Sequence, residues 1–264
     1  MTSIDIDEVR VWAVAAGDLA RQYFNHVASR RKADRSIVTE ADEAIERRLV
    51  EKISARYPNH GILGEEHTQQ NLRNEFVWVL DPIDGTASFV SGLGSWCVSI
   101  GLLRDGVPFL GVIYMPMLGD CYHAEVQQGA FLNDAPIQAS APVDWDDEDW
   151  LATPASLHRR FDLDFLGKTR VLGSTAAQMC YVARGSALGA LLVDARPWDI
   201  AAGLVVVHEA AGTIAPLDPQ VDLSAPLLEG LWSSSPLLVA HPSQIVALRR
   251  IVCVRADHDQ GAKT

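Results

Sequence analysis

Basic residues are scarce in this sequence. Its 22 lysines and arginines stand against 34 aspartates and glutamates, so the formal net charge is -12 at pH 7. A protein that binds the nucleic-acid backbone or an anionic membrane surface needs a basic face, and this charge balance argues against both classes. The acidic excess leaves cations as natural partners.

Cysteine is also rare, and its spacing is uninformative for metal or redox chemistry. The four cysteines are scattered without a CxxC pair, at Cys97, Cys121, Cys180 and Cys253. This spacing excludes a thiolate zinc site and a dithiol redox motif. We expect each cysteine to pack as a small hydrophobic side chain.

We expect no targeting or membrane segment from this sequence. The first ten residues, MTSIDIDEVR, lack the basic and apolar regions of a signal peptide, and no uncharged apolar stretch is long enough to span a bilayer. We therefore expect a reduced, cytoplasmic protein. A length of 264 residues with 48% hydrophobic content can bury a large core, as one domain or as two closely packed lobes.

Periodicity predicts helices and strands that alternate in blocks. Helical spacing indicates a first helix from about Ile4 to Ala28 and a second helix capped by Thr39, with Asp42 as the acidic member of the capping pair. Further helices are predicted over 173–185, 198–212 and 242–252, with Gly212 as a C-terminal cap. Strands are predicted over 61–66, 76–81, 96–103, 107–114, 120–125, 129–137, 189–195 and 237–240. Such blocks favour a mixed α/β (α+β) fold, a layered αβαβα sandwich.

The run WVLDPIDGTASFV places two aspartates at the end of an apparently buried strand. Pro82 can neither continue a ladder nor lie inside a helix, so we expect the chain to leave the strand at Asp81. Gly85 permits a tight entry into a helix that begins near Thr86. A surface turn would explain the same residues if this motif stood alone.

This turn can bring three oxygen ligands together. The carboxylates of Asp81 and Asp84 and the carbonyl of Ile83 can converge on one point, and oxygen ligands suit Mg²⁺ or Mn²⁺ rather than zinc. The free amides of Gly85 and Thr86 can receive an anion beside that cation. The spacing of the acids does not fit an EF-hand or a DxDxT nucleophile motif. A cation next to an anion hole predicts a phosphate site.

Acidic residues elsewhere can join this site. Glu65 and Glu66 lie at the end of a neighbouring strand in GEEH, and Asp199 lies at the start of an apolar helix in PWDIAAG. Each has a simpler explanation, because Glu66 could face solvent and Asp199 could serve only as a helix cap. The stretch DWDDEDW, from Asp144 to Trp150, is better interpreted as a solvated loop than as a metal site.

Four segments, in this order and at these separations, carry a family resemblance: GEE, WVLDPIDGT, GSTAAQMC and WDIAAGLVVVHEAAG. With KADRSIVTEAD and GAFLNDAPI, they make the sequence resemble the inositol monophosphatase family of Mg²⁺-dependent, lithium-sensitive phosphatases. The resemblance covers most of residues 32–212. It implies the layered sandwich of sugar phosphatases and a homodimer.

The resemblance also implies roles for individual residues. The metal ligands, for two or three Mg²⁺ ions that Mn²⁺ can replace, would be Glu65, Asp81, the Ile83 carbonyl, Asp84 and Asp199. The catalytic residues that position and deprotonate the attacking water would be Asp42, Glu65 and Thr86. The substrate-binding residues would be Asp84, Gly85, Thr86, Ser174, Thr175 and Asp199. Lys32 matches a charged position near the site or is an exposed loop lysine, and His67 is expected at the surface.

The implied lobes divide the chain at the acidic stretch. Residues 1–143 would form an N-terminal α+β lobe with most of the metal ligands, and residues 144–264 a C-terminal α/β lobe that supplies Asp199 and the substrate wall. The implied reaction is hydrolysis of a small phosphorylated metabolite by direct attack of metal-activated water, without a covalent intermediate. Neither a nucleic-acid polymer nor a membrane would be a partner.

Two departures from the family pattern leave the substrate open. Leu192 stands where inositol-handling members tend to carry a glutamate, and Ser88 stands where Asn is usual. We therefore expect inositol monophosphate to be hydrolysed without being the best substrate. Histidinol phosphate, fructose bisphosphate and adenosine bisphosphate are alternatives. A metal- and phosphate-binding regulator without catalytic activity is the alternative from another class.

Overall fold

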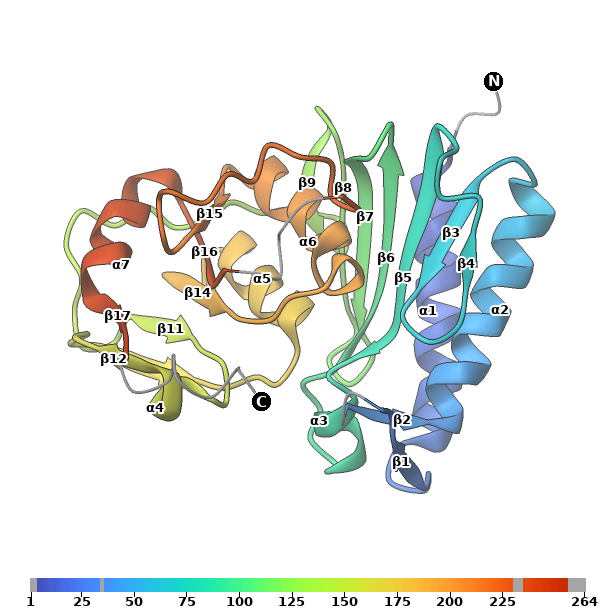
Figure 1. The fold of residues 1–264 in the computed structure, drawn as a ribbon, viewed down its shortest axis with the longest axis horizontal. Coiled ribbons are helices and arrows are strands. Elements are labelled where there is room, and N and C mark those ends of the chain that lie inside the picture. The colour runs from blue at the N-terminus through green and yellow to red at the C-terminus, as the bar shows by residue number, and fades with distance from the viewer. Residues whose placement is uncertain (1–3, 34–35, 230–234, 256–264) are drawn as a thin grey trace.

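The computed structural model describes residues 4–33, 36–229 and 235–255. Its helices and strands form five layers in the order helix, sheet, helix, sheet, helix (Figure 1). This layering confirms the predicted αβαβα sandwich. Within the described residues, no helix combines the length and the apolar character needed to cross a membrane.

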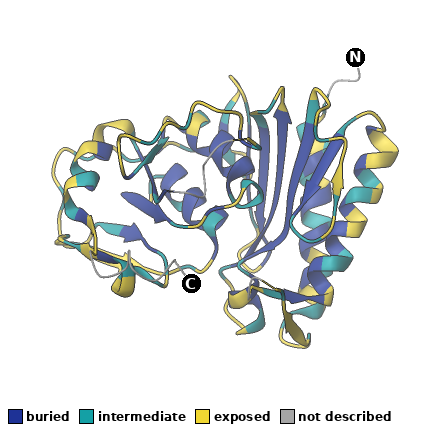
Figure 2. Cartoon of the chain, viewed as in Figure 1, coloured by how far each residue is buried: buried dark blue, intermediate teal, exposed yellow. Residues whose placement is uncertain are grey.

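The first layer consists of two helices, α1 (Ile6–Tyr23) and α2 (Glu40–Arg56). Both pack with their apolar faces on the larger sheet, and their outer faces are exposed (Figure 2). The helix α1 ends before the predicted Ala28, because the backbone leaves the helical conformation at Phe24, with ψ of 129°, and Asn25 follows in a left-handed conformation with φ of 66°. Thr39 caps α2 and forms the predicted capping box with Asp42.

The second layer is an eight-stranded sheet in which one pairing, β3 with β5, is parallel. Its strand order is β10 (Ala135–Pro136), β9 (Gly129–Leu132), β8 (Asp120–Glu125), β7 (Val107–Met115), β6 (Cys97–Arg104), β5 (Phe76–Asp84), β3 (Gly61–Gly64) and β4 (Gln69–Gln70). Successive residues of β5 face opposite sides, so Trp78 packs under α1 while Val77 packs in the central core. The sheet is therefore buried on both faces.

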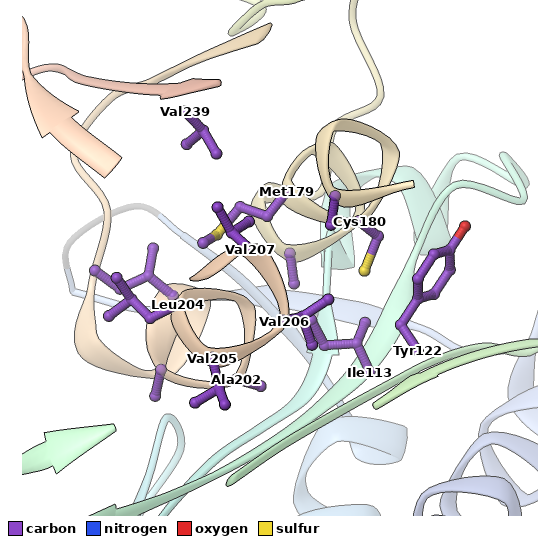
Figure 3. Packing of buried hydrophobic residues seen from close by; sticks show 14 of the residues in the cluster. Ile113, Tyr122, Met179, Cys180, Ala202, Leu204, Val205, Val206, Val207 and Val239 are labelled. Atoms are coloured by element: carbon purple, nitrogen blue, oxygen red, sulfur yellow. The ribbon is translucent and has the colours of Figure 1, made fainter. Parts of the chain in front are cut away.

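The central layer consists of α5 (Thr175–Ala183) and α6 (Pro197–Glu209), which fill the space between the two sheets. Figure 3 shows Val206 on α6 packed near Ile113 of the larger sheet, and Met179 on α5 beside Val207. A side chain at Gly111 on β7 would lie 2.3 Å from the Ala202 carbonyl oxygen. This close approach seats α6 directly on the sheet.

The fourth layer is a five-stranded sheet, and short helices cover its outer face. Its strand order is β13 (Lys168–Arg170), β11 (Trp150–Ala152), β14 (Gly189–Leu192), β16 (Leu237–Ala240) and β15 (Thr213–Pro216). The remaining elements are β1 (Ser29–Arg31), β2 (Ile37–Thr39), α3 (Thr86–Val90), α4 (Leu157–Arg160), β12 (Phe161–Leu163), the 3-10 helix η1 (Pro242–Gln244), α7 (Ile245–Ile251) and β17 (Val252–Val254). The chain crosses between the sheets after β10, in the loop that contains the acidic stretch. The division into two lobes there stays a prediction.

Two local predictions were wrong. The strand β5 does not end at Asp81 but continues to Asp84 with a register shift between them, because a bulge lets the chain pass Pro82 and resume pairing with Cys97. Gly212 is not the left-handed cap of α6: Ala211 takes that conformation, with φ of 61°. Gly212 is required instead for space, since a side chain there would lie 2.8 Å from Val207 Cγ1.

Candidate active site

Three aspartates meet where β5 ends and α6 begins. One carboxylate oxygen from each of Asp81, Asp84 and Asp199 lies within 4.8 Å of the others. The bulge in β5 presents Asp81 and Asp84, and the first turn of α6 presents Asp199. Segments far apart in the sequence therefore assemble one acidic cluster, as expected from the motifs.

Asp81 is the least satisfied member of the acidic cluster. Its side chain is buried, and its Oδ1 atom has no hydrogen-bond partner. Burial raises the pKa of Asp81 well above the usual value, and the nearby charges of Glu65, Asp84 and Asp199 raise it further. An ionised Asp81 therefore needs a cation beside it.

Asp84 is held by the start of α5. Its Oδ2 atom accepts hydrogen bonds from Ser174 Oγ at 2.6 Å and from the Ala176 amide at 2.5 Å, and its Oδ1 atom accepts one from the Thr175 amide at 3.2 Å. Burial raises the pKa of Asp84 to about 6, although these three donors favour the charged form. The carboxylate is thus fixed in orientation before any ligand binds.

Asp199 combines a capping role with membership of the cluster. It lies at the third position of α6, and its Oδ2 atom accepts a hydrogen bond from the Arg196 amide at 2.8 Å. Burial, together with the charge of Asp84, raises its pKa well above the usual value. The sequence allowed Asp199 to be either a helix cap or a member of the metal site, and in the structure it caps α6 and also belongs to the acidic cluster.

Thr86 lies between Asp42 and the turn that follows β5. Its Oγ1 atom is 3.0 Å from the Ile83 carbonyl oxygen and 3.3 Å from Asp42 Oδ1, so its single proton can reach either acceptor. Gly85 makes the tight entry into α3 that was predicted, and it does so in a left-handed conformation with φ of 96°. The backbone turn therefore points the Thr86 hydroxyl back towards α2.

Asp42 is anchored from its other side. Its Oδ2 atom accepts hydrogen bonds from the Thr39 amide at 2.8 Å and from Thr39 Oγ1 at 2.6 Å. Burial raises the pKa of Asp42 to about 6 against the lowering effect of these two bonds. A carboxylate with a pKa near neutrality is suited to accept a proton.

Glu65 lies outside the 4.8 Å group of aspartates and pairs with Lys32 instead. The Lys32 Nζ atom lies 3.0 Å from Glu65 Oε1 and 2.8 Å from Glu66 Oε2. The Glu66 side chain does not face solvent, as one alternative had it, because only 1% of it is exposed. Burial raises the pKa of Glu66 to about 7. His67 is exposed and pairs with Glu43, as expected of a surface residue.

The residues predicted to contact the leaving group of the substrate are partly buried in the structure. Ser174 Oγ donates to Asp84, accepts from the Ala177 amide and lies 3.4 Å from Cys97 Sγ. Leu192, which the resemblance places in the substrate wall, is 2% exposed and packs in the central core beneath α5, so this placement was wrong. Ser88 is also buried and lies 3.4 Å from the Leu172 carbonyl oxygen.

Two residues near the site were missed from the sequence. Cys97 lies beneath the cluster, with its Sγ atom 3.8 Å from Asp84 Oδ2. Glu46 lies on α2 and accepts hydrogen bonds from the turn that carries Glu65 and Glu66. Its spacing of four residues from Asp42 was the signal available, since it puts both acids on one face of the helix.

The residues present fit a divalent cation. The acidic cluster offers only carboxylate oxygens, the donor type that hard cations such as Mg²⁺ prefer. The partnerless Oδ1 atom of buried Asp81 is the strongest indication, because a buried charge without a partner is costly. The nearby cation Lys32 is occupied by Glu65 and Glu66.

Comparisons with known proteins agree with this geometry. The model of the inositol monophosphatase family matches residues 4–253. The chain is 34% identical over 221 residues to inositol monophosphatase 1 of Solanum lycopersicum, which covers 76% of this chain and 80% of that protein. It is 38% identical over 210 residues to a histidinol-phosphatase of Chlorobaculum parvum, covering 76% and 81%. A solved IMPase of Thermotoga maritima superposes with a TM-score of 0.81 at 25% identity, over 93% of this chain and 95% of that one.

Proposed function

Because the chain belongs to the inositol monophosphatase family, we propose that its acidic cluster hydrolyses a small phosphorylated metabolite by direct attack of water. The chain is a phosphatase of this family. The observation that carries the proposed site is the meeting of Asp81, Asp84 and Asp199 within 4.8 Å beside the Asp42–Thr86 contact. These residues combine a cation site with a proton acceptor.

The cofactor we propose is Mg²⁺, with Mn²⁺ as a substitute, in two or three copies. Asp81, Asp84 and Asp199 would hold it, together with Glu65 and the Ile83 carbonyl. Such a cation, when bound, neutralises charge on the phosphate and lowers the pKa of water. Even when Thr86 donates to it, the Ile83 carbonyl keeps a second lone pair for a ligand.

Asp42 and Thr86 would orient the attacking water and take its proton. When Thr86 donates to Asp42 Oδ1, its oxygen keeps lone pairs that can accept a hydrogen bond from water. Thr39 holds the other oxygen of Asp42, so the carboxylate cannot rotate away. The raised pKa of Asp42, about 6, brings its basicity close to neutral pH.

The remaining residues would position the phosphate and the metal ligands. We assign the amides of Gly85 and Thr86 to the phosphate, because they lie at the start of α3, where backbone amides have no partner within the helix. Ser174 and the Thr175 amide donate to Asp84, so we assign them to orienting that carboxylate. The side chain of Thr175, at the same helix start, is the part of this segment proposed to meet substrate.

A panel of phosphomonoesters tests the proposal. Inositol monophosphate, histidinol phosphate, fructose bisphosphate and adenosine bisphosphate would be compared by kcat/KM with Mg²⁺ and with a chelator. We expect Mg²⁺-dependent release of phosphate. Because Leu192 and Ser88 are buried, neither supports ranking inositol monophosphate below the other esters, and the panel decides their order. The presence of a histidinol-phosphatase among the relatives supports including that ester. Binding of Mg²⁺ without turnover of any ester would favour the regulator alternative.

We also propose a homodimer and a cytoplasmic location, both on family resemblance. Light scattering on the purified protein would measure the mass in solution against the 28.8 kDa of one chain. A monomer at the concentrations used for the assays would contradict the first of these proposals.

A further inference from the structure

The carboxylate of Glu46 is buried in the turn that follows β3. Glu46 is only 3% exposed, and its carboxylate accepts four hydrogen bonds from three consecutive residues. The donors are the amides of Glu66 (2.7 Å), His67 (3.0 Å) and Thr68 (2.9 Å) and the Thr68 hydroxyl (2.7 Å). Backbone amides that converge in this way form a cradle for an anion, and here the protein's own carboxylate occupies it.

The turn is built around this carboxylate. Its ends are joined by the Gly64 amide, which donates to the Thr68 carbonyl at 2.7 Å. A side chain on Gly64 would lie 2.4 Å from the Glu46 carboxylate, so only glycine leaves room for it. Hydrogen bonds to a charged acceptor are stronger than neutral ones, which makes Glu46 the main tie between α2 and this turn.

The same helix carries Asp42 one turn earlier. Residues four apart lie on one face of a helix, so α2 presents Asp42 to Thr86 and Glu46 to the turn. The turn in turn carries Glu65, whose own amide donates to the Leu80 carbonyl of β5 at 3.1 Å. Two ties of the backbone, one to α2 and one to β5, therefore set where the main chain of Glu65 lies, and Lys32 contacts its carboxylate.

We propose that Glu46 is a positioning residue that fixes Glu65 relative to Asp42 and Asp81. This inference rests on the proposed function, in which Glu65 holds the cation and helps to position water. Glu46 itself touches no reacting atom, because all four of its contacts are to the turn. Loss of the Glu46 carboxylate should therefore let the Glu65 side chain move within the metal site, without removing a metal ligand.

The first test replaces Glu46 with Gln in the full chain. The amide nitrogen of Glu46→Gln would face N–H donors and break part of the cradle. We expect Mg²⁺ affinity, measured by calorimetric titration, to fall by about 10- to 100-fold, the usual effect of removing a residue that orients metal ligands. Hydrogen exchange at the amides of Glu66, His67 and Thr68 should accelerate. Glu51→Gln, an exposed position on the same helix, is the matched control and should change neither quantity.

A second variant keeps the test decisive if Glu46→Gln does not fold. Thr68→Val removes one donor to the Glu46 carboxylate and preserves side-chain shape and the backbone bonds. We expect a smaller loss of Mg²⁺ affinity, of a few fold. When both variants fold, the double variant should lose less Mg²⁺-binding free energy than the two single variants lose together, because both changes disrupt the same cradle.

The outcomes separate this inference from the proposed function. Folded Glu46→Gln or Thr68→Val proteins with the parent's Mg²⁺ affinity and amide exchange would overturn the positioning role alone. A parent protein that neither binds Mg²⁺ nor hydrolyses any ester would refute the proposed function. Amide exchange still tests Glu46 if the proposed function fails in this way. Faster exchange at Glu66, His67 and Thr68 in the variants would support the conclusion that Glu46 holds the turn, and unchanged exchange would overturn it.

Discussion

The two aspartates that β5 delivers are buried side by side but are satisfied very differently. Asp84 accepts hydrogen bonds from Ser174, Thr175 and Ala176, whereas the Oδ1 atom of Asp81 has no partner. The donors all come from the start of α5, a helix that lies far along the chain. One carboxylate is thus part of the packing between layers, and the other is left for a ligand.

The difference separates stability from function within one motif. An acceptor with three donors contributes to holding α5 against β5, so its removal leaves buried donors unpaired. A buried carboxylate without a partner costs stability in the metal-free protein, so its removal costs nothing there. Replacing the carboxylate by an amide should therefore lower metal-free stability at Asp84 but not at Asp81, although the two residues are only three positions apart.

The largest effect is expected for Asp81→Asn. Residues that only orient metal ligands cost about 10- to 100-fold in activity when removed, so loss of a ligand charge should cost more, on the order of 1000-fold. The metal-free unfolding temperature should stay the same or rise, because a buried charge is removed. Asp84→Asn is the matched comparison and should lose both activity and metal-free stability. Equal melting temperatures for the two variants would break the distinction between the aspartates.

Thr86→Val should lower kcat by about 100-fold, the low end of the contribution of a positioned proton acceptor. The valine keeps the shape and the backbone amide but cannot connect water to Asp42. Calorimetric titration should show Mg²⁺ binding close to that of the parent protein. A parallel loss of metal affinity would place the effect of Thr86 in the metal site instead of in water activation.

Mg²⁺ should stabilise the fold, more at high pH than at low pH. At 100 times its dissociation constant, a ligand adds about 2.7 kcal/mol to the free energy of unfolding. The folded-state pKa values of Asp42 and Asp84 are raised to about 6, and those of Asp81 and Asp199 are also raised. Stability from these groups is fully present below their unfolded pKa near 4 and is lost as the pH rises through the folded values.

Cations compete with those protons, so the shift in melting temperature on adding Mg²⁺ should be larger at about pH 8 than at about pH 5. Thermal melts with and without the metal at both pH values provide the measurement. Asp81→Asn should show a reduced shift at both. A shift that did not depend on pH would argue that the acidic cluster is not where Mg²⁺ binds.

The smallest effect is expected for Ser174→Ala. The change removes the cap of α5 and one donor to Asp84, which should lower the free energy of unfolding by about 1–2 kcal/mol. Activity should fall only a few fold, because the amides of Thr175 and Ala176 still hold Asp84. Ser174→Thr keeps the oxygen and should restore most of both losses in denaturant melts and in the phosphatase assay.

Much of the site could be predicted because its signals are local. Turn chemistry at Pro82 and Gly85 and the short spacing of Asp81 and Asp84 indicated converging carboxylates, and the cap at Thr39 indicated where Asp42 lies. Asp199 could be placed only at a helix start. Its arrival beside Asp84 depends on how α6 packs on the larger sheet, which the spacing within its own motif cannot show.

The sequence by itself determined the blocks of helices and strands that predicted the layered fold, the helix cap at Thr39 and the acidic motif, because each depends on residues close to one another in the chain. The tertiary structure alone decided which carboxylates are satisfied. Asp84 is held by donors from α5, Glu46 is held by a turn that follows β3, and Leu192 faces the central core. Hydrogen-bond partners and burial at these positions come from segments brought together only when the layers pack, and that packing is a property of the whole chain.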